Sequence, residues 1–241
     1  MLHQTRGIAL TTLKFSETSI IAKVYTELFG LQSYLLKGIR KKQSRIKPGL
    51  FQPLTLLELS VYHKEKSTLH SLKEGYNCYP YQTIPFDIRK SSIALFMTEL
   101  VYKSIREEES NSPLFKFLWN SCLTLDNVRE SFSWFHVAFS VQFSRYLGIL
   151  PQADLAGNKH FFDMKEGIFQ ECEPGHPYFL DKQMSSLLKD LLLSDSLVPG
   201  TLHATLKTRN ELLEKILHYY SLHLAGFRGV QSHKILHSVL S

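Results

Sequence analysis

The densest group of side chains with an evident chemical use is a basic run at residues 37–47. It holds six cations and no acid: Lys37, Arg40, Lys41, Lys42, Arg45 and Lys47. Lys and Arg neutralise phosphates and release their counterions, so this composition is typical of a polyanion-binding segment. Flanking residues add a stacking surface and room for close backbone approach: Tyr34, Gly38, Gly49 and Phe51. We predict that the six cations bind nucleic acid and that Tyr34 stacks on a base. The alternative is a solvated loop that only keeps the protein in solution.

The charge of the whole chain is distributed unevenly around this run. Residues 1–80 carry 12 Lys and Arg against 5 Asp and Glu, whereas residues 81–241 carry 16 against 17. A cationic module joined to a neutral one indicates a polyanion-binding part and a partner-binding or scaffold part. Charge alone does not distinguish DNA from RNA.

Two groups of side chains resemble metal ligands only superficially. His160, Cys172 and His176 supply three donors where a structural zinc site needs four. His233 and His237 are four residues apart but lack the Glu of an H-E-x-x-H site. The three cysteines are widely spaced and form neither a C-x-x-C pair nor a disulfide framework. We therefore predict no metal and no cofactor.

Signatures of catalysis and of export are missing from the sequence. It contains no G-x-S-x-G, no P-loop and no G-x-G-x-x-G, so we expect no enzymatic activity and assign no catalytic residue. The residues after Met1 do not form a signal peptide, and no apolar run approaches the length of a membrane span. The chain is expected to be cytoplasmic.

The basic run must be positioned by short strands, because the first 80 residues follow the period of strands. Candidate strands lie at 8–13, 19–25, 31–37 and 54–62, with a weaker one at 68–72. Five short strands with basic, glycine-containing loops predict a small closed or partly open barrel. Pro80 and Pro85 interrupt the pattern, and we place a domain boundary between residues 1–80 and residues 81–241.

Beyond this boundary the apolar residues follow the period of helices. Helices are predicted at 88–107, from Ser112 as N-cap with Pro113 at N1, at 132–147 ending at Gly148, at 182–194 and at 202–224. A hairpin is predicted near 159–172, turning at 165–167. The predicted fold class is α+β and multidomain: a five-stranded barrel, then a mostly helical domain with a small β-hairpin insertion.

Several segments together resemble a known family. At the N-terminal end they are residues 6–10, 25–31, 37–45 with the pattern K-G-x-R-x-x-x-S-R, and 48–53. Further along they are the R-Y-L-G-I-L-P helix end at 145–151, the F-D-M-K-E-G-I-F hairpin at 162–169, and the H-L pair at 223–224 followed by S-H-K-I-L at 232–236. Their order and spacing resemble the bacterial recombination mediator RecO family over most of the chain.

This resemblance implies an OB-fold followed by a helical domain. It implies a DNA repair and recombination protein that binds single- and double-stranded DNA and anneals complementary strands without nucleotide hydrolysis. The implied partners are RecR and the C-terminal tail of SSB, with RecA loaded at gaps, and the implied location is the bacterial nucleoid during repair. The family's DNA contacts carry over to Lys37, Arg40, Lys41, Lys42 and Arg45, while Lys47 is added from charge alone.

The sequence departs from the family pattern at one place. Many relatives carry a four-cysteine zinc module after the L-G-x-x-P element, where this chain has A-D-L-A-G-N at 153–158. We expect the hairpin to be held by packing of Phe161, Phe162 and Phe169 instead. Three other interpretations remain open from sequence: an RNA-binding OB-fold protein, a helical interaction scaffold with an incidental basic loop, and an enzyme with an unrecognised site.

Overall fold

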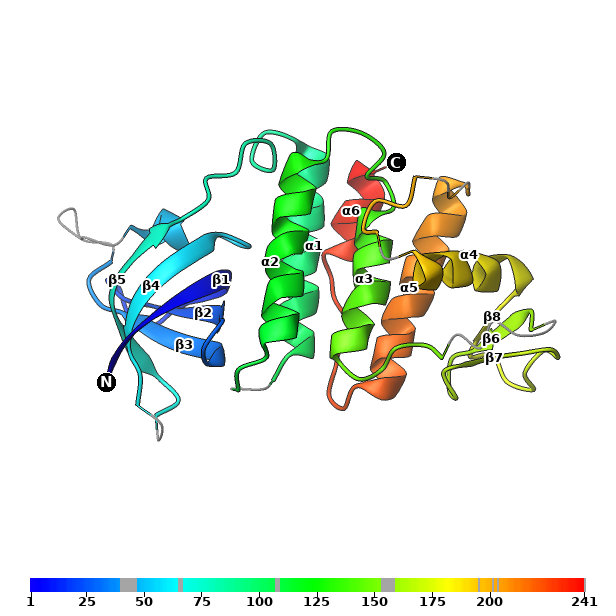
Figure 1. The fold of residues 1–241 in the computed structure, drawn as a ribbon, viewed down its shortest axis with the longest axis horizontal. Helices are drawn as coiled ribbons and strands as arrows, with labels where there is room; N and C mark the ends of the chain where they lie inside the picture. The colour runs from blue at the N-terminus through cyan, green and yellow to red at the C-terminus, as the bar shows by residue number, and fades with distance from the viewer. Residues whose placement is uncertain are drawn as a thin grey trace. The chain divides into compact units, whose positions relative to one another are not determined.

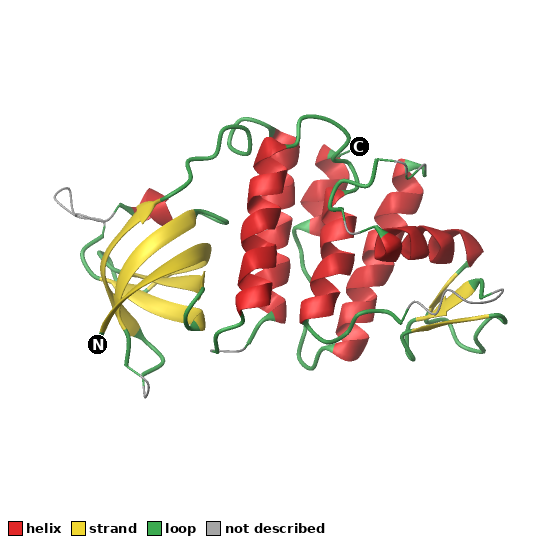
Figure 2. Cartoon of the chain, in the orientation of Figure 1, coloured by secondary structure: helices red, strands yellow, loops and turns green. Residues whose placement is uncertain are grey.

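A computed structural model describes residues 1–39, 47–64, 67–106, 109–152, 159–194, 196–200, 202 and 204–240. The chain forms two compact units, residues 1–126 and residues 127–241. The first contains all five long strands and two helices, and the second contains the other helices and a small sheet (Figures 1 and 2). The boundary placed at residues 80/81 stays a prediction. No described helix has the length and hydropathy needed to cross a membrane.

The five N-terminal strands close into a barrel. They are β1 (Leu2–Lys14), β2 (Ile20–Thr26), β3 (Gly30–Leu36), β4 (Leu56–Tyr62) and β5 (His70–Asn77), paired in the order β1-β2-β3-β5-β4. The barrel closes because residues 2–8 of β1 pair with β4, residues 7–14 of β1 pair with β2, and β3 pairs with β5. The β3–β5 pair alone is parallel, and it consists of Tyr34 opposite His70 and Leu35 opposite Ser71. The predicted five-stranded barrel is confirmed.

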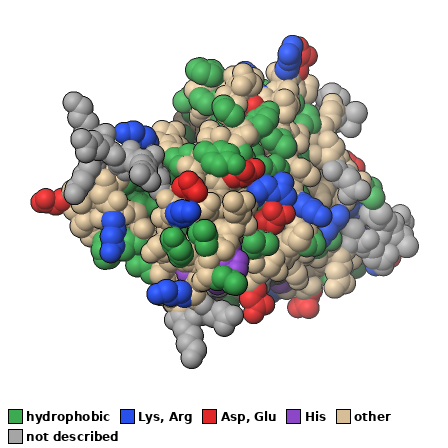
Figure 3. All heavy atoms as spheres, turned by 60° about the vertical axis from the view of Figure 1, so that its left-hand side comes forward, with side chains coloured by type: hydrophobic (Ala, Val, Ile, Leu, Met, Phe, Trp, Pro, Cys, Tyr) green, Lys and Arg blue, Asp and Glu red, His purple; other side chains and the backbone are tan. Residues whose placement is uncertain are grey.

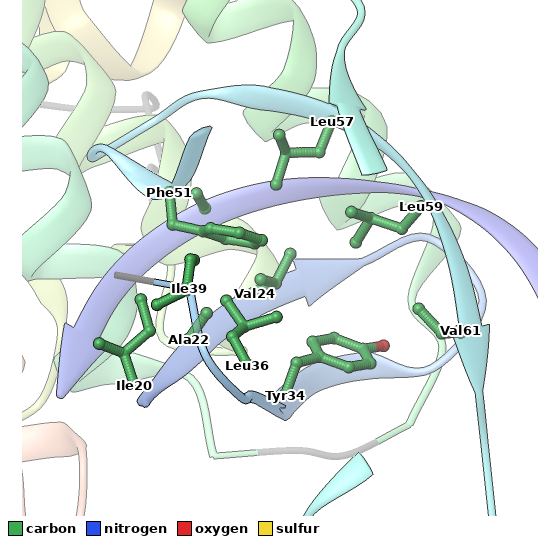
Figure 4. Packing of buried hydrophobic residues seen from close by; sticks show 11 residues of the cluster. Ile20, Ala22, Val24, Tyr34, Leu36, Ile39, Phe51, Leu57, Leu59 and Val61 are labelled. Carbon is green, nitrogen blue, oxygen red and sulfur yellow. The ribbon is translucent and has the colours of Figure 1, made fainter. Parts of the chain in front are cut away.

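Side chains of alternate residues along the strands fill the barrel interior. The inward side chains form one buried cluster, with Ala22 and Val24 from β2, Tyr34 and Leu36 from β3, and Leu57, Leu59 and Val61 from β4 (Figure 4). Ile39 and Phe51, which follow β3 and precede β4, belong to the same cluster. The segment between these strands is therefore fixed to the barrel core at both ends.

Helices α1 (Ile88–Ser104) and α2 (Ser112–Asn127) complete the first unit. Asp87 caps α1 by accepting the backbone N–H of Arg89, as expected of an N-cap carboxylate. The start of α2 differs from the prediction by one residue. Asn111 is the cap, since its side chain accepts the N–H of Leu114 at 3.0 Å, and Ser112 already lies inside the helix.

Asp126 fastens the chain segment that leaves the barrel. This buried carboxylate, 1% exposed, accepts the backbone N–H groups of Gln82, Thr83 and Ile84 at 2.8–3.1 Å. Lys90 is also buried, and its Nζ donates to Thr83 Oγ1 and to the Asp126 main-chain carbonyl. Burial alone would raise the pKa of the Asp126 carboxyl, but the backbone donors outweigh burial and hold its pKa below the ordinary value.

Arg6 ties the barrel to α2. Its guanidinium donates to both carboxylate oxygens of Glu27, at 2.7 and 2.9 Å, and lies 5.0 Å from the ring centroid of Trp119 and 5.5 Å from that of Phe115. The hydrogen bond from Arg6 is the main cause that lowers the pKa of Glu27. The side chain of Arg6 is 42% exposed, so solvent screens the ion pair and the ring contacts supply part of the attachment.

We expect Arg6→Gln to lower the free energy of unfolding by about 1 kcal/mol, because it removes both a bidentate ion pair and a cation–π contact. Urea denaturation measures the change. Lys207→Gln is the control, because Lys207 pairs with Glu211 at 3.8 Å on an exposed helix surface and is expected to contribute almost nothing. Equal stabilities of the two variants would contradict the role assigned to Arg6.

The second unit is built around α3 (Phe135–Tyr146), α4 (Lys182–Leu193), α5 (Leu206–His223) and α6 (His233–Val239). Phe135, Phe139 and Phe143, spaced four residues apart on α3, are fully buried. Gly148 adopts a φ of +71° and ends the helix, as predicted. The hairpin of β6 (Phe161–Asp163) and β7 (Ile168–Gln170) is confirmed, and a third strand, β8 (Phe179–Leu180), which the sequence prediction missed, pairs with β6.

A group of basic side chains lies between α3, α5 and α6. His136 is fully buried, and Arg209 is 8% exposed and donates to the main-chain carbonyl of Leu240. His237 contacts Glu214 at 3.9 Å and the ring of His233 at 5.5 Å. Burial, reinforced by Arg209 and His237, lowers the pKa of His136 to about 3. His136 is therefore neutral near pH 7.

Candidate nucleic-acid interface

The two described ends of the basic run adjoin the barrel core. Lys37 is exposed directly after β3, and Lys47 is exposed directly before the short 3-10 helix η1 (Pro48–Phe51). Ile39, 2% exposed, and Phe51, 3% exposed, anchor the two sides of the run in the core cluster. The predicted residues Arg40, Lys41, Lys42 and Arg45 lie outside the described residues. The structure thus places Lys37 and Lys47 at the two ends of the run, facing solvent.

Tyr34 does not belong to a stacking surface, and this prediction is corrected. Its side chain is 0% exposed, and its ring lies inside the barrel among the core residues (Figure 4). The nearest described ring is that of His70, at 6.1 Å between centroids. Phe51 is buried in the same cluster. No base can reach either ring, because each contributes to the packing that closes the barrel.

An exposed apolar row on the outside of the barrel was missed from sequence. The strand register places Leu13 opposite Ile21 and Ile21 opposite Leu35, so these three side chains share one face. Their inward neighbours Ala22, Tyr34 and Leu36 are in the core, which puts the row on the outer face. Leu13 is 48% exposed, and Phe15, just beyond it, is 58% exposed. We call Leu13, Ile21 and Leu35 the outer row. Extending the predicted strand 8–13 by two residues would have indicated that Leu13 and Phe15 share a face.

The barrel surface formed by β1, β4 and β5 has a different character. A groove of about 760 Å³ there is lined by both signs of charge, including Arg6, Lys73, Glu58 and Glu74. Arg6 is engaged by Glu27, and Glu58 accepts a hydrogen bond from Tyr76. Figure 3 shows acidic, basic and hydrophobic side chains interspersed on the described part of the face that it presents. This surface therefore carries no excess of positive charge among these four residues.

The second unit encloses no room for a ligand among its described residues where α3, α4 and α5 meet the small sheet. The cavity there has a volume of about 10 Å³ and is lined largely by apolar side chains. This is the lower limit for a single water molecule, so the region is packed core. The expectation that RecR and the C-terminal tail of SSB are partners stays a prediction.

The histidines near the hairpin have structural partners. His176 Nε2 lies 3.2 Å from Asp163 Oδ2, and its Nδ1 accepts the N–H of Tyr178 at 3.3 Å. Among the residues that the structure describes, no three His, Cys, Asp or Glu side chains gather as metal ligands. A four-cysteine zinc module does not fit this donor set, because Cys172 is the only cysteine of the second unit.

Aromatic packing holds the hairpin, as predicted for two of its three residues. Phe162 and Phe169 are 1% and 2% exposed, with ring centroids 4.9 Å apart, and Phe162 also contacts Tyr219 at 5.6 Å. Phe161 is only half-buried and packs edge-on against Phe179 at 6.1 Å. Phe161 therefore contacts β8 rather than the centre of the hairpin core.

Two family models match the chain. The one described as recombination protein O N terminal covers residues 1–81, and the one described as recombination protein O C terminal covers residues 85–231. The chain is 36% identical over 241 residues to the DNA repair protein RecO of Phocaeicola vulgatus, covering 100% of both chains. It is 37% identical over 240 residues to that of Bacteroides fragilis, covering 98% of both. It is 37% identical over 246 residues to that of Flavobacterium psychrophilum, covering 100% of both.

Proposed function

Because the chain belongs to the RecO family of DNA repair proteins, we propose that it is a recombination mediator. It binds single- and double-stranded DNA, anneals complementary strands, and helps to load RecA on gaps coated with SSB. The observation that carries the DNA-binding step is the basic run, whose exposed ends Lys37 and Lys47 flank anchors in the barrel core.

The mechanism is charge neutralisation. Cations of the run contact the phosphates of two strands, lower their mutual repulsion and release counterions, so that complementary strands meet at less cost. No covalent bond forms or breaks in this step, and no general acid or nucleophile is required. The anchors matter because a segment fixed at both ends loses less conformational entropy on binding than a free tail.

The near-neutral part of the chain, residues 81–241, is proposed as the platform for RecR and for the C-terminal tail of SSB. Its 16 cations against 17 acids fit protein contacts better than phosphate contacts. Binding of a labelled SSB tail peptide to the full chain, competed by the unlabelled peptide, tests this assignment.

The DNA-binding proposal is tested by fluorescence anisotropy with single-stranded DNA at several salt concentrations. If about four to six phosphates are contacted, the logarithm of the association constant should fall with log salt at a slope of about −3 to −4. Reversing Lys41 and Lys42 to Glu should weaken binding and flatten the slope by about 1.4, since two single-strand phosphate contacts are lost.

The matched control is the double reversal of Arg129 and Arg228 to Glu, two exposed cations of the second unit. It changes the net charge by the same amount and should leave the slope unchanged. Binding that ignores salt, or equal losses in the two double variants, would remove DNA from the basic run. Preference for RNA over DNA of the same sequence would favour an RNA-binding OB-fold protein.

A further inference from the structure

We propose that the outer row of the barrel, with Phe15 at its rim, holds the bases of single-stranded DNA and so sets the preference for single strands over duplex. This inference rests on the proposed DNA-binding function and deepens it. It assigns base contact to an apolar surface that is distinct from the cations that contact phosphate. Phe15 takes the stacking role that the buried Tyr34 cannot perform.

The strand register builds this surface. Leu13, Ile21 and Leu35 lie side by side across three adjacent strands, each about 4.8 Å from the next. Ile21 and Leu35 are half-buried and Leu13 is 48% exposed, so the row is a flat apolar strip open to solvent. At the other end of the same barrel face, Ile8 and Tyr25 are 1% exposed, and Tyr25 stacks on Phe115 of α2 at 6.3 Å. The first unit's own helix covers one end of the barrel face and leaves the other open.

Phe15 stands where the strip meets the basic run. Its N–H donates to the Ser19 carbonyl at 3.1 Å, which continues the β1–β2 ladder one step past the Lys14–Ile20 pair and keeps Phe15 on the same outer side as Leu13. Lys37 follows directly after β3, two strands away, at a backbone separation of roughly 10 Å. The side chain of Phe15 is 58% exposed and is therefore open to a base.

The chemistry around the strip favours a nucleic-acid strand. Lys37 is exposed next to Leu36 at the end of β3, and Lys23 lies on the same face as Ile21, donating to Ser33 Oγ across the strands at 2.6 Å. Among residues 11–26 and 30–39 the only acid is Glu17. Aromatic side chains beside a cationic track bind single strands, because each unpaired base offers a π face. The bases of a duplex are already stacked on one another, so the strip selects for single strands.

Anisotropy titrations of full-length Phe15→Ala test the inference, with a labelled oligothymidylate and with a duplex of the same length. We expect single-strand affinity to fall about tenfold, as for the loss of one base–aromatic stack. Duplex affinity and the salt slope should stay unchanged, because Phe15 carries no charge. Phe15→Trp should retain single-strand affinity. The variant should fold normally, since the side chain is largely exposed.

Phe86→Ala is the matched control, because Phe86 is an 84% exposed phenylalanine of the same unit that precedes α1. Single-strand affinity in Phe15→Ala equal to that in Phe86→Ala, with salt-dependent binding intact, would overturn the inference and leave the strip to a protein partner. Equal loss of single-strand and duplex affinity would also overturn it. Absence of salt-dependent binding in the wild-type protein would instead overturn the proposed function itself.

Discussion

Asp126→Ala is expected to lower the free energy of unfolding by about 3 to 5 kcal/mol, because it removes the acceptor of three backbone N–H groups and the carboxylate near the buried Lys90. The carboxylate accepts three consecutive backbone N–H groups, those of Gln82, Thr83 and Ile84. An alanine cannot replace these contacts, and the enclosed position of Asp126 keeps bulk water from doing so. The buried Lys90 also loses the nearby negative charge that favours its protonated form.

Urea denaturation followed by circular dichroism measures this loss. Asp181→Ala is the comparison variant. Asp181 caps α4 at an exposed site by accepting a single N–H, that of Met184, so its loss should lower the free energy of unfolding by about 1 kcal/mol. Asp126→Asn should fall between wild type and Asp126→Ala, since the amide keeps one acceptor oxygen. A loss in Asp126→Ala no larger than in Asp181→Ala would show that the segment after the barrel is held by other contacts.

The stability of the protein should fall as the pH decreases below about 6.5, and His136 should account for about 1.4 kcal/mol of that fall per pH unit. In the folded chain, burial and the charges of Arg209 and His237 lower the pKa of His136 to about 3. The unfolded chain therefore binds a proton at His136 between about pH 6.5 and pH 3, while the folded chain does not. The stability is fully present above pH 6.5, and roughly 3 kcal/mol of it is lost by pH 4.5.

Comparison of wild type with His136→Leu between pH 7.5 and pH 4.5 isolates this contribution. The variant need not match wild type in stability at pH 7.5. Between pH 6.5 and pH 4.5, however, the slope of its unfolding free energy against pH should be smaller by about 1.4 kcal/mol per pH unit, which corresponds to one proton. His160→Gln serves as the control, because His160 is exposed and its replacement should leave the profile unchanged. Parallel profiles for wild type and His136→Leu would mean that His136 takes up its proton at an ordinary pKa in the folded state.

The barrel could be predicted because apolar and polar residues alternate along its strands. Which face of each strand points into the barrel could not be predicted. In residues 31–37 both faces of the strand carry apolar side chains, so alternation alone does not tell which face is buried. Tyr34 was placed on the wrong face for this reason. The pairing of β3 with both β2 and β5 decides the question, and this pairing depends on residues far away in the sequence.

The elements that sequence reasoning missed or shortened are those with the weakest local signal. The strand predicted at 68–72 extends to Asn77, through exposed Lys73 and Glu74, where no apolar alternation indicates it. The two-residue β8 exists only through its pairing with β6. Phe15 lies past the end of β1, in a stretch that periodicity assigns to a loop. The basic run, by contrast, was evident from composition, because charge requires no pairing partner to be recognised.

On one outer face of the barrel, Ile8 of β1 lies opposite Tyr25 of β2 and Leu56 of β4, and all three side chains are buried. This row limits where the chain can be divided when domains recombine during evolution. The family models meet between residues 81 and 85, whereas the first compact unit continues to Asp126. A cassette ending at residue 81 would leave behind α2, whose Phe115 stacks on Tyr25, and would present this row to water as a contiguous apolar patch prone to association. We therefore expect the barrel and its two helices to be inherited as one unit. A barrel transferred to another protein would need both helices to cover this row.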